Sequence, residues 1–265
     1  LPHHAAVNGV SDVKSSWDQQ DAAACGDDLL AMRVYSSRLL GREPSLVLHG
    51  GGNTSVKVTE RDFFGDTLEV LYVKGSGWDL ATIEKAGFSP VRMDTLTRLA
   101  GIADLRDTDM VTQQRTALLD PYAPNPSVEA ILHALIPFRF VDHTHTDAVV
   151  TLTNSPDGEA RIRALYGDRV LYIPYVMPGF ILARTIAEMT AETDWSKLEG
   201  MVLLNHGLFT FHDDAEQSYE RMIKLVSEAE EALKADGAWD APRQSSSAGS
   251  ADLLHLATIR RQVSL

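Results

Sequence analysis

The chain has 265 residues, of which 44% are hydrophobic and 23% are charged. That composition is typical of a folded globular protein and excludes disorder over most of the chain. The 24 basic residues against 37 acidic ones leave a net charge of −13, which argues against nucleic acid as the main partner.

The sequence gives little sign of a compartment other than the cytoplasm. Its one cysteine, Cys25, excludes an internal disulfide and zinc sites built from several thiolates. Residues 1–16 lack a basic region followed by an apolar core, so we expect no signal peptide. No apolar run approaches the roughly 20 residues that cross a bilayer. We therefore expect a cytoplasmic protein that binds neither membranes nor nucleic acid.

Strands and helices are predicted to alternate along most of the chain. The first helix is expected at 27–40, where Leu29, Leu30 and Val34 recur near helical spacing and Gly41 provides a stop. Strands are expected at 54–59, 68–73, 140–144, 170–176 and 201–204. Further helices are expected at 94–100, 109–118, 127–135, 157–165, 180–190 and 213–234.

This alternation predicts a layered α/β domain. We expect the domain to span residues 27–240, after an N-terminal extension at 1–26. Residues 241–265 are expected to form a serine-rich linker followed by a short helix at 251–263.

The segment His143-Thr144-His145 is the strongest signal for a metal. Alternate side chains of a strand point to the same face, so two imidazoles at this spacing can grip one divalent ion. His206 follows a buried strand and is a candidate third ligand. Three imidazoles would leave one position of a tetrahedral zinc ion open. Each histidine alone could be an ordinary strand-end residue, but the three together favour a metal site.

Glu129 lies at the start of the helix predicted from Ser127. A carboxylate there could be a metal ligand, a base, or each in turn. The alternative is a helix-start glutamate favoured by the helix dipole, and the sequence alone favours that alternative. His133, one turn later, is expected to face the same way as a supporting or packing residue.

Two glycine-rich segments, at 50–55 and 74–77, are candidate anion-binding loops. Each offers backbone amides, small side chains and a hydroxyl or amide group. Neither matches a Walker loop or a Gly-x-Gly-x-x-Gly fingerprint, so no nucleotide site is expected. An ordinary glycine-rich turn is the alternative for each segment.

Taken in order, five motifs resemble the class II aldolase/adducin family over roughly residues 45–235. The motifs are Gly52-Asn53-Thr54-Ser55-Val56-Lys57, Lys74-Gly75-Ser76-Gly77, Pro126-Ser127-Val128-Glu129, His143-Thr144-His145 and Asn205-His206-Gly207. Segments 73–80 and 126–153 look most similar to the aldolase module of rhamnulose-phosphate aldolase/short-chain dehydrogenase fusion proteins. No dinucleotide fingerprint follows, so we expect no dehydrogenase half in this chain.

The resemblance implies a three-layer α/β/α sandwich with a mixed central sheet. It implies one zinc ion per chain, held by His143, His145 and His206, with Glu129 as fourth ligand at rest and as catalytic base. The implied phosphate-binding residues are Asn53, Ser55, Ser76, Gly77 and Ser127. Val128 stands where the best-known sugar-phosphate aldolases carry a second serine, so one family contact to phosphate is missing. The family forms tetramers with active sites between subunits, so we expect a homotetramer with helix 213–234 packed around the site.

The implied activity is that of a lyase. It would cleave a ketose 1-phosphate of the rhamnulose or fuculose type to dihydroxyacetone phosphate and an aldehyde, with zinc as the Lewis acid. Cobalt or manganese are alternatives to zinc, although an all-imidazole site favours zinc. Alternative functions are a pentulose-phosphate 4-epimerase, a sugar-acid phosphate decarboxylase and a non-catalytic adducin-like module. Glu129 argues against an epimerase, which usually has aspartate there, and the three histidines argue against a non-catalytic module.

Overall fold

A seven-stranded sheet lies at the centre of the computed structural model, which describes residues 12–239 and 253–263. The strand order is β3-β2-β1-β4-β7-β6-β5. The strands are β1 (Asn53–Arg61), β2 (Thr67–Lys74), β3 (Phe88–Arg92), β4 (Phe140–Thr144), β5 (Val170–Ile173), β6 (Gly200–Leu203) and β7 (Gly207–His212). β5 and β6 run parallel, and the other neighbours are antiparallel, so the sheet is mixed as expected.

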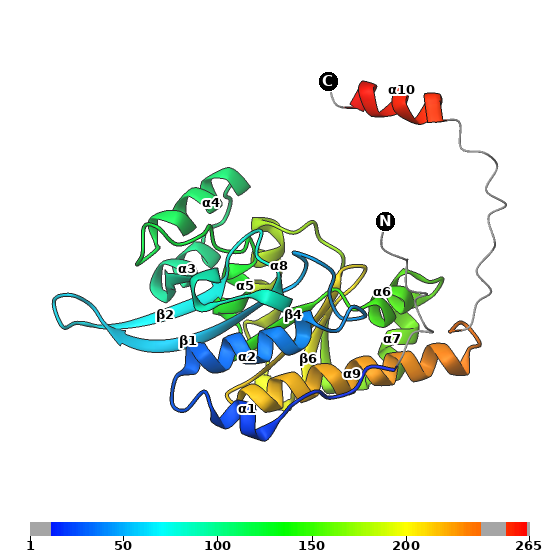
Figure 1. Cartoon of the computed structure of the whole chain (residues 1–265), viewed down its shortest axis with the longest axis horizontal. Coiled ribbons are helices and arrows are strands. Elements are labelled where there is room, and N and C mark those ends of the chain that lie inside the picture. The colour runs from blue at the N-terminus through cyan, green and yellow to red at the C-terminus, as the bar shows by residue number, and fades with distance from the viewer. Residues whose placement is uncertain (1–11, 240–252, 264–265) are drawn as a thin grey trace, which may run out of the picture.

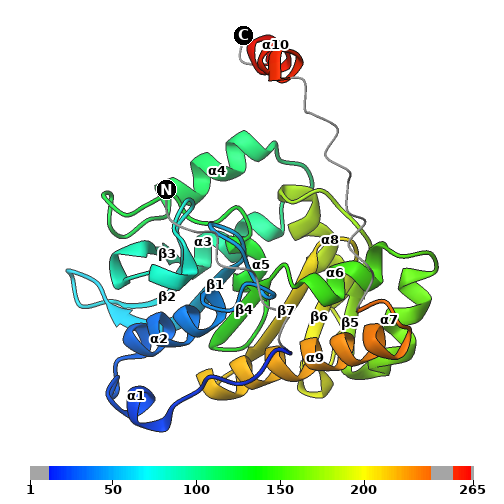
Figure 2. The same cartoon turned by 45° about the vertical axis from the view of Figure 1, so that its right-hand side comes forward.

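Helices cover both faces of this sheet (Figures 1 and 2). One face packs against α2, α6, α7 and α9, and the other packs against α3, α4, α5 and α8. The helices are α1 (Gln19–Ala23), α2 (Leu29–Gly41), α3 (Met93–Ala100), α4 (Asp107–Thr116), α5 (Ala130–Leu135), α6 (Asp147–Asn154), α7 (Gly158–Tyr166), α8 (Phe180–Thr190), α9 (Ala215–Ala235) and α10 (Leu253–Val263). The main body of the chain is therefore the expected three-layer α/β/α sandwich.

Each face of the sheet has its own hydrophobic core. In β6, Val202 packs on the α9 side, whereas Met201 and Leu203 pack on the side of α5 and α8. All three side chains are almost completely buried. Because successive side chains of a strand point to opposite faces, a strand covered on both sides is apolar along its whole length. This explains why β6 was recognisable as a continuous apolar run.

Several elements differ from the sequence-based expectations. β3, β7, α1 and α6 were not expected from the sequence. The strand predicted at 170–176 ends at Ile173, because Pro174 has no N–H to donate to a neighbouring strand. The helix predicted at 251–263 is α10, described from Leu253, and the linker predicted at 241–250 lies outside the described residues.

The helix expected to start at Ser127 begins three residues later, at Ala130. The Ser127 N–H donates to the Lys74 carbonyl at 3.1 Å, which ties the segment to the end of β2. The backbone of Glu129, with φ of −91° and ψ of 11°, is not yet helical. Residues 127–129 therefore belong to the loop structure at the sheet edge rather than to the helix.

The described part of the N-terminal segment packs along α9. The Val13 N–H donates to Glu230 Oε2 at 2.9 Å, and the Ser16 N–H donates to the Tyr219 hydroxyl at 2.9 Å. The Trp17 ring lies 5.8 Å from the Tyr219 ring. These contacts attach residues 12–17 to the main body of the domain.

A buried ion pair joins α2 to β4. Arg33 Nη2 lies 2.6 Å from Asp142 Oδ1, and both side chains are completely buried. The Ser218 hydroxyl of α9 donates to the second carboxylate oxygen of Asp142 at 2.5 Å. Burial lowers the pKa of Arg33, and the neighbouring Asp142 opposes that shift. Since Asp142 precedes His143, this pair fixes the strand that carries the first candidate metal ligand.

Within the described ranges, the molecule contains no helix that is both long and apolar enough to cross a membrane.

Candidate metal centre and active site

Strand register brings the candidate residues together. β1 and β4 are antiparallel neighbours, and Asn53 pairs with His143. The side chains of Asn53 and Ser55 point to the α5 side, where they contact Glu129 and His133. Thr54 and Asp142 point the other way, toward α2. The candidate site therefore lies on the α5 side of the sheet, at the edge where β1 begins and β4 ends.

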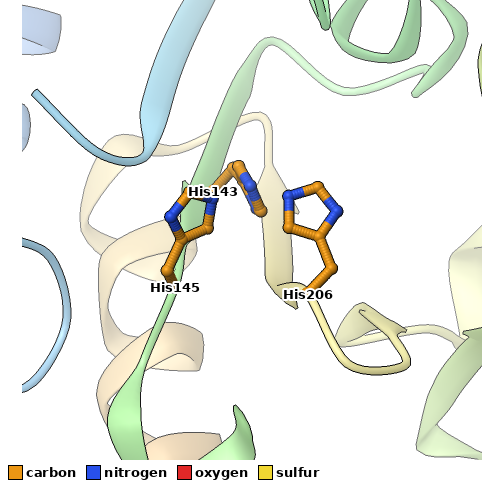
Figure 3. Close-up of side chains that lie close together, drawn as sticks. All are labelled: His143, His145 and His206. Carbon is orange, nitrogen blue, oxygen red and sulfur yellow. The ribbon is translucent and has the colours of Figure 1, made fainter. Parts of the chain in front are cut away.

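The three histidines converge on one point (Figure 3). His143 belongs to β4, His145 follows the end of β4, and His206 lies in the turn between β6 and β7. One ring nitrogen from each lies within 4.8 Å of the others. The ring centroids are 4.8 Å apart for His143 and His145, and 5.0 Å apart for His143 and His206.

The turn that carries His206 requires a special backbone. Asn205 has a positive φ of 59°, and its side-chain amide donates to the Thr153 carbonyl of α6 at 3.1 Å. A Cβ atom on Gly207 would lie 2.3 Å from the Thr144 carbonyl oxygen, so only glycine allows this approach. The Asn205-His206-Gly207 motif therefore allows the turn that carries His206 to lie directly against the end of β4.

The protonation state of the histidines fits a divalent metal. His143 Nδ1 donates to the Leu208 carbonyl at 3.1 Å, which leaves the lone pair of its buried Nε2 without a hydrogen-bond partner in the described structure. Burial holds the pKa of His143 well below its usual range and also lowers the pKa of His145 and His206. Neutral imidazoles with free lone pairs are the form that binds metal. The histidine cluster can therefore hold a divalent ion.

Glu129 faces this cluster and not the helix that follows it. Its Oε2 lies 3.5 Å from His143 Nε2, and its Oε1 lies 3.6 Å from His206 Nε2. The side chain is 5% exposed and makes no capping hydrogen bond to the N-terminus of α5. Glu129 therefore precedes α5 as expected, but its carboxylate lies against the histidines rather than capping the helix.

Burial raises the pKa of Glu129, while His206, Asn53 and Lys74 each lower it. Asn53 Nδ2 donates to Glu129 Oε2 at 2.6 Å and to the Ser127 hydroxyl at 3.1 Å. One amide group thus fixes the orientation of the carboxylate. Because burial favours the neutral form of this carboxyl, Glu129 is better suited to exchange a proton with a bound ligand than an exposed glutamate is.

A second layer of hydrogen bonds holds Asn53. His133 Nε2 donates to Asn53 Oδ1, and His133 Nδ1 accepts from the Ser55 hydroxyl at 2.8 Å. His133, predicted to lie beside Glu129, thus acts on it through Asn53. Ser55 is completely buried and does not line the cavity described below. Its hydroxyl is committed to His133 and not to an anion.

A cavity of about 260 Å³ opens beside Glu129. Both glycine-rich loops border it, together with His145 and His206 of the histidine cluster. Its lining residues are Gly50, Gly51, Gly52, Asn53, Lys74, Gly75, Ser76, Gly77, Ser127, Val128, Glu129, His145, Pro178 and His206. His143 is completely buried and does not line the cavity.

The side chain of Lys74 was missed as a site residue. From the sequence, the backbone amides and small side chains of segment 74–77 were considered. The positive charge of the lysine side chain was the signal that could have identified it. The helix expected around the site, α9, lies behind it: Met222 contacts Thr144 on the face of the sheet opposite His143.

Comparison with known proteins identifies the family. The sequence profile described as "Class II Aldolase and Adducin N-terminal domain" matches residues 33–233. The chain belongs to this family. A Bacillus subtilis (strain 168) relative named "Uncharacterized oxidoreductase YuxG" is 38% identical over 219 residues. That match covers 83% of this chain but 31% of the relative, so the chain spans about a third of the relative's length.

Solved structures agree with the family's fold. The N-terminal class II aldolase domain of a conserved protein from Thermoplasma acidophilum is 42% identical, with a TM-score of 0.73 over 78% of this chain and 94% of that one. The L-fuculose-1-phosphate aldolase of Thermus thermophilus is 17% identical, with a TM-score of 0.50 over 80% of this chain and 100% of that one. At that identity the second likeness supports the fold alone.

The buried imidazole of His133 predicts a dependence of stability on pH. Burial holds the pKa of His133 well below its usual range. Below about pH 6.5 the unfolded chain therefore binds a proton that the folded chain does not, and stability falls as the pH falls. When the pH is lowered from 7.5 to 5.5, the unfolding free energy of both proteins should fall. We expect the fall in His133→Gln to be about 1 kcal/mol smaller than that in the wild type. Urea unfolding at the two pH values measures this difference.

Ser55→Ala is the matched control for that measurement, because it breaks the same hydrogen-bond chain but leaves the titrating group in place. It should be less stable than the wild type at both pH values and keep the wild-type pH dependence. Equal pH dependence in His133→Gln and the wild type would contradict the assignment of this loss of stability to the His133 imidazole.

Proposed function

We propose that the chain is a zinc-dependent aldolase that cleaves a ketose 1-phosphate, of the rhamnulose or fuculose type, to dihydroxyacetone phosphate and an aldehyde. The observation that carries the proposal is the position of Glu129. Its carboxylate faces His143 and His206 at 3.5 and 3.6 Å, in a cavity bordered by two glycine-rich loops. A base beside a metal site and an anion cradle are the parts that such a cleavage needs.

In this proposal His143, His145 and His206 hold the ion, and Glu129 completes the ligand set when no substrate is bound. Zinc is preferred because three imidazoles suit it. The ion, when bound, supplies Lewis acidity that stabilises negative charge on the oxygens of the ketose. As the carbon–carbon bond breaks, the hydroxyl that becomes the aldehyde releases its proton to solvent, and the carboxyl of Glu129 delivers a proton to the carbon next to the carbonyl. Asn53 holds the carboxyl group in place for that transfer.

The phosphate is assigned to the loops that border the cavity. Asn53, Ser76, Gly77 and Ser127 line it and offer amide and hydroxyl groups to an anion. Ser55 lies outside the lining, so its part in the proposal is to hold His133, and through His133 to orient Asn53.

We further propose that subunits assemble into a tetramer with the site between them. Val128 lines the cavity and is 41% exposed. Met177 directly precedes Pro178 of the lining and is 69% exposed, and Leu48, two residues before Gly50, is 59% exposed. A neighbouring subunit covering these apolar groups would also close the cavity to water. Residues 27–240 form the catalytic domain in this proposal, with 1–26 and 241–265 as extensions, and the enzyme acts in the cytoplasm.

Metal content tests the ligand assignment. We expect about one zinc ion per chain in purified wild-type protein, and loss of the metal in His143→Ala, His145→Ala and His206→Ala, since each removes one of three ligands. Mass spectrometry of metal content after dialysis measures this. His212→Ala, which removes a histidine at the end of β7, should keep the metal. Full occupancy in all three ligand variants would show that the site is elsewhere.

A screen of ketose 1-phosphates tests the activity itself. Release of dihydroxyacetone phosphate, followed with a coupled dehydrogenase, is the expected result. Interconversion of pentulose phosphates without cleavage of a carbon–carbon bond would instead assign an epimerase, and release of carbon dioxide from a sugar acid would assign a decarboxylase. Metal binding without turnover of any of these would favour a binding module.

A further inference from the structure

The hairpin between β1 and β2 carries two exposed aromatic side chains at its tip. Phe63 is 97% exposed and Phe64 is 85% exposed, and their ring centroids lie 5.5 Å apart. The hairpin extends away from the helices that cover the sheet (Figures 1 and 2). Neighbouring apolar groups that are left in water in this way mark a surface that another molecule covers.

Hydrogen bonds hold the turn of this hairpin in one shape. Asp62 Oδ1 accepts from the N–H groups of Phe64 and Asp66, both at 2.9 Å. Arg61 Nη1 donates to the Gly65 carbonyl at 3.1 Å, and Gly65 has a φ of 90°, in the region that favours glycine. Because the turn is already formed, little backbone freedom is lost when its two aromatic rings enter a partner.

An apolar groove of about 450 Å³ lies along α3 and the segment that leads into α4. The apolar side chains that line it come from Leu99, Ile102 and Leu105, and the polar ones come from Thr95, Arg98 and Gln113. Ile102 is 38% exposed although it is apolar. None of these residues lines the active-site cavity, so the groove is a separate surface. The aromatic tip of the hairpin does not line the groove of its own subunit.

The hairpin tip and the groove are complementary in area and in charge. Two phenylalanine side chains bury about 300–500 Å² together, which is roughly half of the area that each partner contributes to a stable interface. Asp66 is exposed at the tip, and Arg98 is exposed at the groove. Neither forms an ion pair with another described residue. The chain therefore carries both halves of a matching pair of surfaces.

We propose that the Phe63–Phe64 tip of one subunit inserts into the α3–α4 groove of a second copy of this chain, with Asp66 facing Arg98. The hairpin and the groove are different surfaces, so the contact is heterologous and repeats from copy to copy until a ring closes. The inference rests on the proposed tetramer and deepens it, because it names the two surfaces that meet. It does not depend on the proposed reaction, since none of these residues lines the cavity.

Light scattering on a sizing column tests the contact. Phe63→Ser combined with Phe64→Ser removes the aromatic tip, and Ile102→Glu puts a charge into the groove. All three side chains are exposed, so the fold should remain, which circular dichroism checks. We expect each variant to dissociate at a concentration on the order of 100-fold above that of the wild type, the usual effect of losing a dominant contact.

Met189→Ser is the matched control, because it removes an exposed apolar side chain of α8 outside both surfaces. It should assemble like the wild type. Dissociation of Met189→Ser to the same extent as the other variants would show a general sensitivity to lost apolar surface and would overturn the assignment.

Mixing the two defective variants is the decisive measurement. The variant without the aromatic tip keeps a working groove, and Ile102→Glu keeps a working hairpin. One intact contact can therefore form between them, and the ring cannot continue from it. The mixture should give a dimer of one copy of each variant, which neither variant forms alone.

Reversal of the two charges tests how the hairpin is oriented in the groove. Asp66→Arg places like charges together and should weaken assembly several-fold. Combined with Arg98→Asp, the same substitution restores an attractive pair, so assembly should recover. A double variant as weak as Asp66→Arg would overturn the proposed facing of Asp66 and Arg98.

The outcomes separate this inference from the proposed function. A wild type that is monomeric overturns both the hairpin contact and the proposed tetramer. A wild type that assembles, with hairpin and groove variants that assemble equally tightly, overturns the hairpin contact and leaves the tetramer standing. Dissociation of both variants without a dimer in their mixture also overturns it, since the two surfaces would then not meet each other. Metal content and turnover, measured separately, decide the proposed activity.

Discussion

Replacing Glu129 with glutamine should reduce turnover by a factor on the order of 10²–10⁴ while the metal stays bound. Glutamine keeps the size and one oxygen of the side chain but cannot take up a proton at neutral pH. The three imidazoles remain, and they suffice to hold the ion. The amide of Asn53 can still donate to the remaining oxygen, so the side chain should keep its position. Steady-state rates of aldehyde release and metal analysis of the same preparation measure the two effects.

Glu230→Gln is the matched control for this experiment. Glu230 is also buried, at 1% exposure, and its carboxylate accepts from the Val13 N–H far along α9 from the site. Its replacement should leave turnover close to that of the wild type. Binding of glycolohydroxamate, which chelates a metal through two oxygens, reports an intact metal site and should be unchanged in both variants. A near-wild-type rate in Glu129→Gln would sink the proposed mechanism and leave the metal site in place.

Breaking the Arg33–Asp142 pair should cost about 3–5 kcal/mol of unfolding free energy. In Arg33→Met the carboxylate of Asp142 keeps its hydrogen bond from the Ser218 hydroxyl. It loses its only charged partner in the described structure and remains completely buried. The cost arises from the unpaired charge more than from the lost attraction, because both groups were removed from water on folding. Urea unfolding of metal-free protein measures it without interference from metal binding.

A double substitution tests that explanation. Arg33→Met combined with Asp142→Leu removes both charges, so it should be less destabilising than Arg33→Met alone. Arg163→Met, which breaks the exposed Arg163–Glu159 pair on α7, is the control and should cost much less. A loss in Arg33→Met no greater than in this control would contradict the buried-pair account.

The elements that were predicted well are those with a local signal. β4 and α8 have the bounds expected from the sequence, and α9 differs by two residues at its start and one at its end. A long amphipathic helix and an apolar strand show their periodicity within a single segment. β3 and β7 were missed because their pairing partners decide them: β7 is fixed by its antiparallel contacts with β4 and β6.

The sequence by itself determined the family and the set of candidate ligands, because five short motifs in a fixed order suffice for both. It could not place Glu129 in the site, since the sequence alone favours the helix dipole as the explanation of a carboxylate before a helix. The tertiary structure decided its position, because it places the carboxylate 3.5 Å from His143 Nε2 and 3.6 Å from His206 Nε2. It also showed that Ser55 contacts His133 and does not line the cavity, and that Lys74 does line it. The physical reason is strand register: which face a side chain takes, and which residue it meets on the next strand, is set by long-range pairing that no local pattern encodes.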